Sequence, residues 1–264
     1  MKIFIINMER SKDRREKVTK QMQQLGLDYE FFSAVDGNAM SQEEVDKYID
    51  HEREYFRVLK RGEIGCFLSH YFLFEKISKL DVEAAIVLED DVVISKNFPA
   101  LIKELEQIIQ PEDAFLFYSI LLQPVGFDTD KKLKNGYTLC DVDNVRSLFG
   151  TQGYMIGRQA AKNLADNLLP FNNVVDDWLW YTEHKYIKNL QIVFPFPLKP
   201  TPDFSDIHDQ DVRGTRFGGF KTFIRQYKLF PFWHIMMNVR RKRLEKHGIE
   251  QIKFNGKSVD IKFR

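Results

Sequence analysis

Apolar residues at two different spacings divide the first part of the chain into strands and helices. Short, continuous apolar runs predict strands, whereas apolar residues three or four positions apart predict helices. The pattern predicts, in order, a strand at 2–7, a helix at 11–25, a strand at 29–32, a helix from residue 41, a helix at 63–79, a strand at 84–88, a helix at 99–110 and a strand at 114–120. This β-α-β-α-α-β-α-β order is typical of an α/β fold in which helices cover a sheet.

Polar residues at the predicted boundaries carry capping signals. Asp13 and Glu16 are placed as a capping pair for the first helix, and Gly26 is placed to end it. Ser41 and Glu44 have the spacing of a capping box for the second helix. These signals support the order of elements independently of the apolar pattern.

The later part of the chain has a less regular pattern. Residues 121–145 mix Gly, Pro and Asp without a clear period, which predicts loops or a small hairpin near the site. An apolar stretch at 153–156 is followed by apolar residues at helical spacing over 160–168. Four prolines between 195 and 202 predict an extended crossing segment. No repeat or linker interrupts the chain, so we expect a single domain.

Composition places the chain among soluble globular proteins. It has 264 residues, of which 44% are hydrophobic and 29% charged. The apolar run at the N-terminus is too short for a signal peptide or a membrane span, so we expect a cytoplasmic protein. Cys66 and Cys140 have no CxxC partner and form no metal motif, which predicts reduced thiols.

Charge is unevenly distributed, and residues 213–264 predict a basic, aromatic-rich helical extension. Between Arg213 and His247 there are ten Lys or Arg against one Glu, although the whole chain carries only +1. Aromatic residues recur at helical spacing at Phe217, Phe220, Phe223, Tyr227 and Phe230. Such a stripe either packs on the domain or holds the protein on anionic lipid at the cytoplasmic face of the inner membrane. The acidic remainder of the chain disfavours nucleic-acid binding.

Three consecutive carboxylates end the most apolar predicted strand. Residues 84–88 are all apolar, and Glu89, Asp90 and Asp91 follow at once. In open α/β sheets the ligand crevice lies beyond the carboxyl ends of the strands, where three carboxylates would repel one another unless a cation sat among them. Mn²⁺ or Mg²⁺ would suit these oxygen ligands and would complete its shell with phosphate oxygens. The alternative is an acidic, solvated strand end.

Five motifs in the same order resemble those of glycosyltransferase family 25. They are IIN at 5–7 with Arg10, Asp13 and Arg14, FFSAVDG at 31–37, GEIGCFLSH at 62–70, LEDD at 88–91 and GTQGY at 150–154. The resemblance runs from about residue 2 to 182. It implies a GT-A type, Rossmann-like fold, a UDP-sugar donor, a divalent metal and transfer with inversion. The catalytic domain would be 1–212, with a donor-binding part at about 1–120 and an acceptor part at about 121–212.

The resemblance also implies which residues contact the nucleotide. Asp36 would lie near the nucleoside, although an Asp-Gly turn explains it equally well. Arg14 would face the diphosphate from the first helix, against the alternative of a solvated helix charge, which is the interpretation we prefer for Arg10. Gly65, Ser69 and His70 lie in the GEIGCFLSH motif. We expect Ser69 or His70 to contact the donor, while the other is a buried polar group.

The metal would be held by Glu89 and Asp91, with Asp90 contributing to donor binding. Other GT-A enzymes have a further metal ligand late in the chain, which points here to His208 or, alternatively, Asp206. Imidazole suits Mn²⁺ better than Mg²⁺. His208 is therefore the candidate third ligand.

Inverting transfer requires a base opposite the leaving group. Asp176 and Asp177 stand between apolar residues and Trp178, a context that can raise the pKa of a carboxylate. The family match favours Asp176, whereas a helix N-cap is the alternative for one of the pair. The sequence thus predicts a metal-dependent transferase that moves a hexose, galactose by preference, to a lipooligosaccharide sugar. Another UDP-hexose transferase, a nucleotidyltransferase and a non-catalytic nucleotide-sugar binding module are the alternatives.

Overall fold

A mixed β-sheet forms the centre of the molecule. The computed structural model describes residues 1–52, 58–121, 125–201, 251–254 and 257–260. Among these, ten strands form one sheet in the order β14-β13-β7-β8-β11-β5-β10-β3-β1-β2. These strands are β1 (Lys2–Asn7), β2 (Glu30–Ser33), β3 (Ala84–Glu89), β5 (Asp113–Leu116), β7 (Val125–Lys132), β8 (Thr138–Val142), β10 (Gly153–Gly157), β11 (Asn189–Phe194), β13 (Gln251–Phe254) and β14 (Lys257–Asp260).

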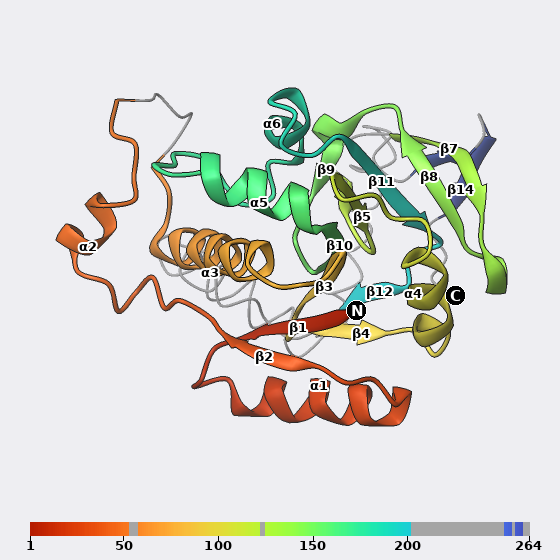
Figure 1. Cartoon of the computed structure of the whole chain (residues 1–264), viewed down its shortest axis with the longest axis horizontal. Helices are drawn as coiled ribbons and strands as arrows, with labels where there is room; N and C mark the ends of the chain where they lie inside the picture. Colours follow the sequence, from red (N-terminus) through yellow and green to blue (C-terminus); the bar gives the residue numbers. More distant parts are fainter. Residues whose placement is uncertain (53–57, 122–124, 202–250, 255–256, 261–264) are drawn as a thin grey trace, which may run out of the picture.

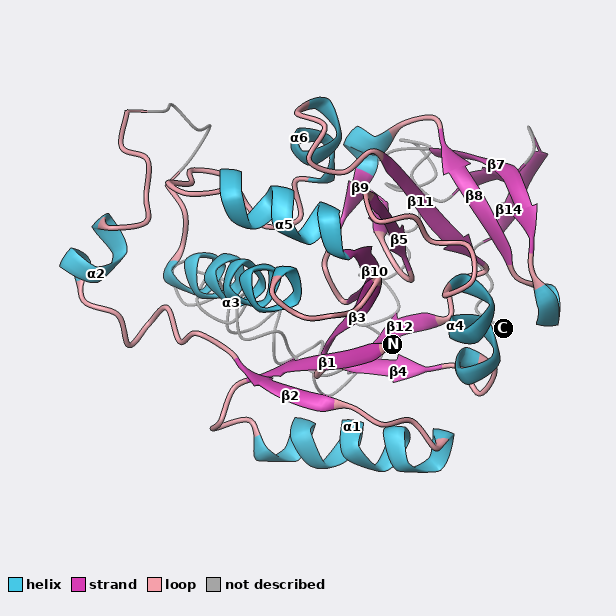
Figure 2. Ribbon diagram, viewed as in Figure 1, coloured by secondary structure: helices cyan, strands magenta, loops and turns pink. Residues whose placement is uncertain are grey.

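Helices lie on both faces of the sheet (Figure 1; Figure 2). They are α1 (Lys12–Leu25), α2 (Gln42–Asp46), α3 (Arg61–Ser78), α4 (Phe98–Leu105), α5 (Arg158–Asn167) and α6 (Trp178–Glu183), with 3-10 turns at Lys134–Gly136 and Val145–Ser147. Two small sheets pair β4 (Val92–Ile94) with β12 (Leu198–Pro200) and β6 (Ile120–Leu121) with β9 (Leu148–Phe149). The predicted α/β class is therefore confirmed.

The sheet separates two hydrophobic cores because successive strand residues point to opposite faces. In β1, Phe4 and Ile6 pack with buried residues of α3, α5 and α6, whereas Ile3 and Ile5 pack with those of α1 and α4. Residues of β3 from Ala84 to Leu88 are at most 4% exposed, as expected for a strand covered on both faces. Burial of both faces fixes the register, since a shift by one residue would exchange the two cores.

The first helix begins differently from the prediction. Its N-cap is Ser11, which makes no side-chain capping hydrogen bond, and Asp13 and Glu16 both lie inside the helix. The predicted capping pair is therefore wrong. Gly26 does end the helix, with a left-handed φ of 62°. The second predicted cap is confirmed, because Ser41 accepts a hydrogen bond from the backbone of Glu44 while the Glu44 carboxylate accepts one from the Ser41 N–H.

Several later elements also differ from expectation. Helix α4 ends at Leu105 rather than near 110, and the strand expected at 114–120 is divided into β5 and β6. The segment expected to form loops or a small hairpin near the site forms β7 and β8, which extend the sheet on the side of β11 away from β3. At the C-terminus, β13 and β14 are strands and not helix. The rest of the predicted helical extension, with its aromatic stripe, lies outside the described residues.

Parallel pairing brings three strand ends to one edge. β1 pairs in parallel with both β2 and β3, so their carboxyl ends lie together. β10 runs antiparallel to β3 and begins at this edge, where Gly153 pairs with Leu88. Within the described part of the chain, none of the helices combines the length and the apolar character needed to cross a membrane.

Candidate functional site

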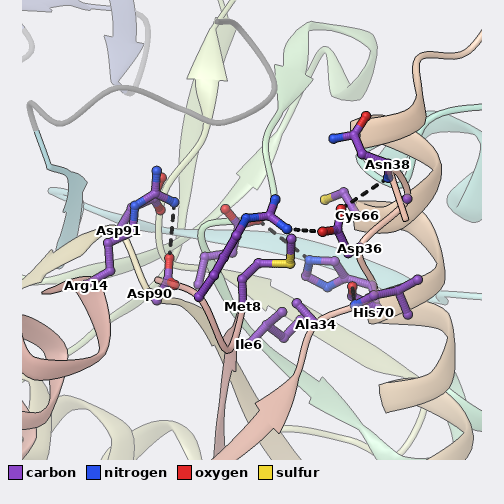
Figure 3. A pocket seen from close by; sticks show the side chains of 16 residues that line it. Ile6, Met8, Arg14, Ala34, Asp36, Asn38, Cys66, His70, Asp90 and Asp91 are labelled. Carbon is purple, nitrogen blue, oxygen red and sulfur yellow. Dashed lines mark hydrogen bonds and ion pairs between the residues drawn. The ribbon is translucent and has the colours of Figure 1, made fainter. Parts of the chain in front are cut away.

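A pocket opens where the carboxyl ends of β1, β2 and β3 meet the first half of α3 (Figure 3). Its walls combine an apolar side, two arginines and the three carboxylates that follow Leu88. It is lined by Ile6, Met8, Arg10, Arg14, Ala34, Val35, Asp36, Gly37, Asn38, Gly62, Cys66, Ser69, His70, Glu89, Asp90 and Asp91. The structure thus brings together most of the residues predicted for donor and metal binding.

Asp90 is fixed by donors from the first strand and the first helix. Its carboxylate accepts a hydrogen bond of 2.7 Å from Asn7 Nδ2, and Arg14 Nη1 lies 3.5 Å from its other oxygen. Burial raises the pKa of Asp90, while Asn7 and Arg14 act in the opposite direction. Asp90 therefore orients Arg14 at the pocket wall and has both oxygens occupied.

Asp91 has a buried oxygen without a hydrogen-bond donor. Among the described residues, Asp91 Oδ1 is buried and has no partner. Burial, with the negative charges of Glu89 and Asp90, raises the pKa of Asp91 to about 7. The backbone of Asp91 is held by the residue that follows β12, because the Asp91 carbonyl accepts a hydrogen bond of 2.7 Å from Thr201 N–H. A buried carboxylate oxygen without a donor is a ready ligand for a cation.

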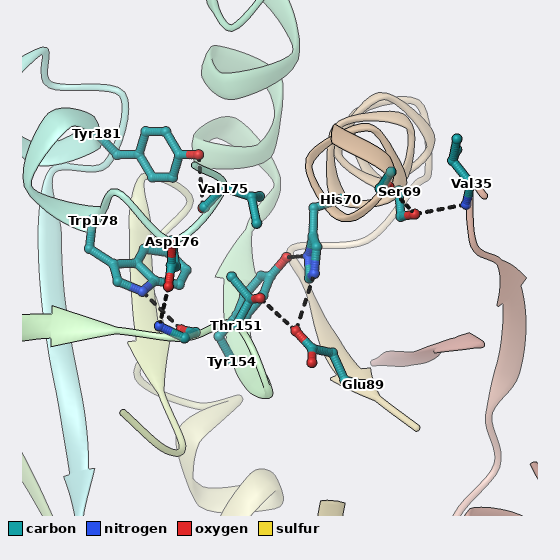
Figure 4. A network of polar contacts seen from close by, with 12 residues as sticks. Val35, Ser69, His70, Glu89, Thr151, Tyr154, Val175, Asp176, Trp178 and Tyr181 are labelled. Carbon is teal, nitrogen blue, oxygen red and sulfur yellow. Dashed lines mark hydrogen bonds and ion pairs between the residues drawn. The ribbon is translucent and has the colours of Figure 1, made fainter. Parts of the chain in front are cut away.

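The carboxylate of Glu89 points toward His70 of α3 and toward Thr151 (Figure 4). Its Oε1 accepts a hydrogen bond of 2.5 Å from Thr151 Oγ1 and lies 3.6 Å from His70 Nε2. Burial alone would raise the pKa of Glu89, but His70 and Thr151 hold it below its ordinary value. Glu89 is therefore an ionised carboxylate whose oxygen faces α3.

His70 is a buried member of this network. It is 1% exposed, and its Nδ1 lies 2.8 Å from Tyr154 Oη. Its Nε2 has no hydrogen-bond partner among the described residues. Cys66 lies one helical turn earlier on α3, and the ligand atoms of Cys66, His70 and Glu89 lie within 4.8 Å of one another. His70 therefore lines the pocket with a buried Nε2 that faces Glu89 Oε1 at 3.6 Å without a hydrogen bond between them.

The loop after β2 forms the opposite wall. Asp36 pairs with Arg10 Nη1 and accepts a hydrogen bond of 3.1 Å from Asn38 N–H. Ser69 accepts a hydrogen bond from Val35 N–H at 2.8 Å and donates one back to α3, so it holds this loop against the helix. The turn expected at Asp36 is present, and its carboxylate also faces the pocket.

Gly65 allows α3 to approach this loop closely. It does not line the pocket, and a Cβ atom at this position would lie 2.6 Å from both Gly37 N and Val35 O. Such a distance is below any normal contact with backbone atoms. The glycine predicted to bind the donor thus packs against this loop and shapes the pocket wall.

The two predicted base candidates have different surroundings. Asp177 is the N-cap of α6, where its side chain accepts a hydrogen bond of 3.1 Å from Trp180 N–H. Asp176 accepts a hydrogen bond of 2.7 Å from Gly150 N–H, and burial raises its pKa. Asp176 does not line the pocket itself, but Gly150 immediately precedes Thr151, which binds Glu89 (Figure 4). Asp206 and His208 lie outside the described residues.

Sequence reasoning missed several residues of the site. Arg10, for which we prefer a solvated charge, is 52% exposed, but it also lines the pocket and pairs with Asp36. Asn7, Thr151 and Tyr154 hold site residues through side-chain contacts. A signal was available for these three, since each lies in a motif that carries the family resemblance.

Comparison with protein families defines the class to which the chain belongs. The sequence profile described as "Glycosyltransferase family 25 (LPS biosynthesis protein)" matches residues 1–179. The chain therefore belongs to glycosyltransferase family 25. The predicted family is confirmed, and the matched region includes every described residue of the pocket.

Individual relatives come from animals and bacteria. A glycosyltransferase 25 family member of Aedes aegypti is 34% identical over 62% of this chain and 28% of its own length. Procollagen galactosyltransferase 2 of Homo sapiens is 30% identical over 69% of this chain and 30% of its length. Lipooligosaccharide biosynthesis protein lic2B of Haemophilus influenzae is 27% identical over 62% of each chain. The chain thus spans less than a third of the length of the two animal relatives.

Two solved structures show weak overall similarity. A putative glucose-1-phosphate thymidylyltransferase from Bacillus anthracis shares 11% identity and a TM-score of 0.36 over 73% of this chain and 86% of its own. A glycosyltransferase involved in glycosylation of the major capsid of PBCV-1 shares 12% identity and a TM-score of 0.33 over 73% of this chain and 82% of its own. Similarities of this size support no functional argument.

Proposed function

We propose that this protein is a metal-dependent, inverting glycosyltransferase of the GT-A type. It transfers a hexose, galactose by preference, from a UDP-sugar to an acceptor sugar of a lipooligosaccharide. The observation that carries the proposal is Asp91 Oδ1, a buried oxygen without a donor beside an arginine-bearing pocket at the strand ends. Membership of a family that includes named galactosyltransferases and a lipooligosaccharide biosynthesis protein supports the substrate class.

The pocket has the chemistry that a nucleoside diphosphate requires. Arg14 and Arg10 supply positive charge to the pocket. The pocket lies at the edge of the sheet beyond the carboxyl ends of parallel strands, where ligands bind in open α/β sheets. Ile6, Met8 and Ala34 give one side an apolar surface against which a base can pack. We infer that the base lies toward Asp36 and the diphosphate toward Arg14.

The carboxylates fit a hard divalent cation. Glu89 and Asp91 would hold Mn²⁺ or Mg²⁺, because their oxygens are the ligand type that these ions prefer and Asp91 Oδ1 has no competing donor. When bound, the ion would neutralise negative charge on the departing UDP. His208 remains the proposed third ligand. In the sequence, His208 follows β12 and Thr201, which lie next to β4 and Asp91, and this supports the proposal.

Asp176 is the proposed base. In the transfer step the acceptor oxygen forms a bond to the anomeric carbon, the bond between that carbon and the UDP oxygen breaks, and Asp176 takes the acceptor proton. Burial raises its pKa above that of an exposed aspartate, which makes the ionised carboxylate a stronger base. Asp177 is less suited because its carboxylate already caps α6.

A thermal-shift panel tests the donor and the metal together. UDP-galactose, UDP-glucose, UDP-GlcNAc and GDP-mannose are each added with and without Mn²⁺. A ligand that binds only the folded state raises the melting temperature, so UDP-galactose with Mn²⁺ should give the largest shift. If Mn²⁺ leaves the shift by every UDP-sugar unchanged, the metal role is wrong. Equal or larger shifts with UDP-glucose would replace galactose as the donor sugar.

Product analysis separates transfer from the remaining alternatives. With radiolabelled UDP-galactose and a lipooligosaccharide acceptor, the label should move to the acceptor. A nucleotidyltransferase would instead make or consume a nucleoside triphosphate. A binding module would leave the UDP-sugar intact, whatever acceptor is added.

The basic segment after residue 213 supports a further proposal about the acceptor. We infer that it holds the enzyme on anionic lipid, where a glycolipid acceptor would be found. Flotation with vesicles that contain anionic lipid tests this. Deletion of residues 213–264 should abolish co-flotation, and unchanged flotation would rule the proposal out.

A further inference from the structure

Cys66, His70 and Glu89 place three different metal-ligating groups on one wall of the pocket. Cys66 and His70 are four residues apart on α3, so both side chains lie on the same face of the helix. Glu89 reaches this face from the end of β3. Their ligand atoms lie within 4.8 Å of one another, a condition that no other group of three His, Cys, Asp or Glu in the described chain meets.

The buried nitrogen of His70 is the observation that points to a ligand. His70 Nε2 is buried with no hydrogen-bond partner among the described residues, although its side chain is 99% covered. Glu89 Oε1 lies 3.6 Å from this nitrogen. When Nδ1–H donates to Tyr154, the lone pair of Nε2 faces a carboxylate oxygen, and a cation between them would satisfy both atoms.

The spacing suits a small tetrahedral ion. Two ligands of a tetrahedral Zn²⁺ with bonds of about 2.0–2.1 Å are about 3.3 Å apart, close to the 3.6 Å between His70 Nε2 and Glu89 Oε1. A small rotation of the Cys66 side chain would complete a set of three protein ligands. The open side of the pocket leaves the fourth position to water.

Neighbouring hydroxyl groups orient two of the ligands. Tyr154 Oη lies 2.8 Å from His70 Nδ1, and Thr151 Oγ1 donates to Glu89 Oε1 over 2.5 Å. Contacts of this kind fix the tautomer of a ligating histidine and the direction of a ligating carboxylate. They come from β10 and the turn before it, which are packed in the centre of the sheet.

We propose that Cys66, His70 and Glu89 form a binding site for a thiophilic divalent ion such as Zn²⁺, separate in chemistry from the oxygen ligands at Asp91. On binding, the Cys66 thiol gives its proton to solvent and a sulfur–metal bond forms. A thiolate and an imidazole favour Zn²⁺ over Mg²⁺ or Mn²⁺. Because Glu89 belongs to both sets, and if the proposed function holds, Zn²⁺ here would compete with the ion that binds the diphosphate.

Cobalt absorption tests the site without any sugar nucleotide, so the outcome does not depend on the proposed function. Co²⁺ bound to a thiolate gives a near-ultraviolet charge-transfer band. Titration of the full chain should produce this band, saturating at about one ion per chain, and Zn²⁺ should remove it. Cys66→Ser should abolish the band. Cys140→Ser, which alters the other cysteine, should retain it, because Cys140 is buried in β8 on a different part of the sheet.

A neighbouring variant and a labelling experiment complete the test. Tyr154→Phe should keep the band and weaken Zn²⁺ binding by about tenfold, since only the orientation of His70 is lost. In the unaltered chain, Zn²⁺ should slow alkylation of Cys66 by iodoacetamide at least about tenfold, a result that requires no variant to fold. Absence of the band, its survival in Cys66→Ser, its loss in Cys140→Ser, or equal alkylation rates would each overturn the proposal.

Discussion

Two regions of this molecule each gather several carboxylates, and they differ in how their polar atoms are satisfied. The first is the pocket beside β3, and the second is a polar groove over β5, β8 and β11 that is lined in part by Asp113, Asp130 and Asp141. In the groove, Asn189 donates to Asp113 over 2.7 Å and Gln191 donates to Asp141 over 2.9 Å. These amide partners are side chains of the same sheet.

In the pocket, by contrast, buried atoms are left without donors. Asp91 Oδ1 and His70 Nε2 have no partner among the described residues. Burying a polar atom costs free energy unless a hydrogen bond or an ion compensates for it. Acidic residues alone therefore do not distinguish a site from a polar surface. The distinguishing feature is a buried atom that the protein itself does not satisfy.

The same substitution made in the pocket and in the groove should give the largest difference in transfer activity. Asp91→Asn removes a proposed metal ligand, so transfer activity should fall about 100- to 1000-fold and the Mn²⁺-dependent thermal shift with UDP should disappear. Asp141→Asn makes the same change in the groove, where activity should stay within about twofold. Both are measured by transfer of labelled hexose. Similar losses of activity in the two variants would show that the unsatisfied oxygen of Asp91 does not distinguish the pocket from the groove.

The next largest effect is on kcat, and it distinguishes Asp176 from Asp177. Asp176→Asn should lower kcat about 100-fold while the thermal shift with UDP-galactose and Mn²⁺ is kept, because the variant lacks only the base. Asp177→Asn should change kcat by less than about threefold, since asparagine is also a good N-cap. Single-turnover transfer measures both. The reverse result would assign the base to Asp177.

A smaller effect on stability is expected at the wall between α3 and the loop after β2. Gly65→Ala places a Cβ atom against Gly37 N and Val35 O, so the free energy of unfolding should fall by about 1–3 kcal/mol. UDP affinity should fall with it, because Asp36 follows Val35 on that loop. Urea denaturation and calorimetry measure the two. An unchanged urea midpoint would mean that the close approach is not required.

A further effect on stability concerns pH in the absence of metal. The pKa of Asp91 is about 7 in the folded protein, above its value of 3.8 without burial, so the folded state binds the extra proton. The protonated Asp91 carboxyl therefore adds to the stability of the folded state at acid pH, relative to the ionised form. This contribution is lost as the pH rises to about 7. Relative to Asp91→Asn, the metal-free protein should lose melting temperature between about pH 4 and 7, and the difference should then level off.

Addition of Mn²⁺ sharpens the same measurement. A bound cation favours the ionised carboxylate, so Mn²⁺ should stabilise the protein at pH 8 more than at pH 5. The Asp91→Asn variant should show no such dependence. A melting temperature that follows pH equally in both proteins would assign the dependence to other groups.

The sequence was sufficient for the parts of the site that are contiguous in the chain. The apolar run of β3 and the three acids after it predict a buried strand that ends at a rim, and the structure has both. Family motifs identify the loop at Asp36 and the helix with Ser69 and His70, which also line the pocket. The positions of these elements could be predicted because each depends on a local pattern.

Contacts between distant residues were beyond the sequence. Asn7 binds Asp90 across 83 positions, and His70 meets Tyr154 across 84. The sequence around Cys66 has no metal-binding spacing, because the nearby Glu89 comes from β3 whereas Cys66 lies on α3. The capping pair at Asp13 and Glu16 failed for a related reason, since spacing alone does not fix the residue at which a helix begins.

The pairing of β4 with β12 has a consequence for how Asp91 works. β4 begins directly after Asp91, and its partner strand ends directly before Thr201, whose N–H holds the Asp91 carbonyl. This hydrogen bond is a clamp from a remote part of the chain that fixes the backbone of Asp91, so the ion proposed to bind there would meet a carboxylate that is already positioned. Loosening this clamp by Pro200→Gly should weaken Mn²⁺ binding in calorimetry, chiefly through a less favourable entropy, although no ligand has been altered.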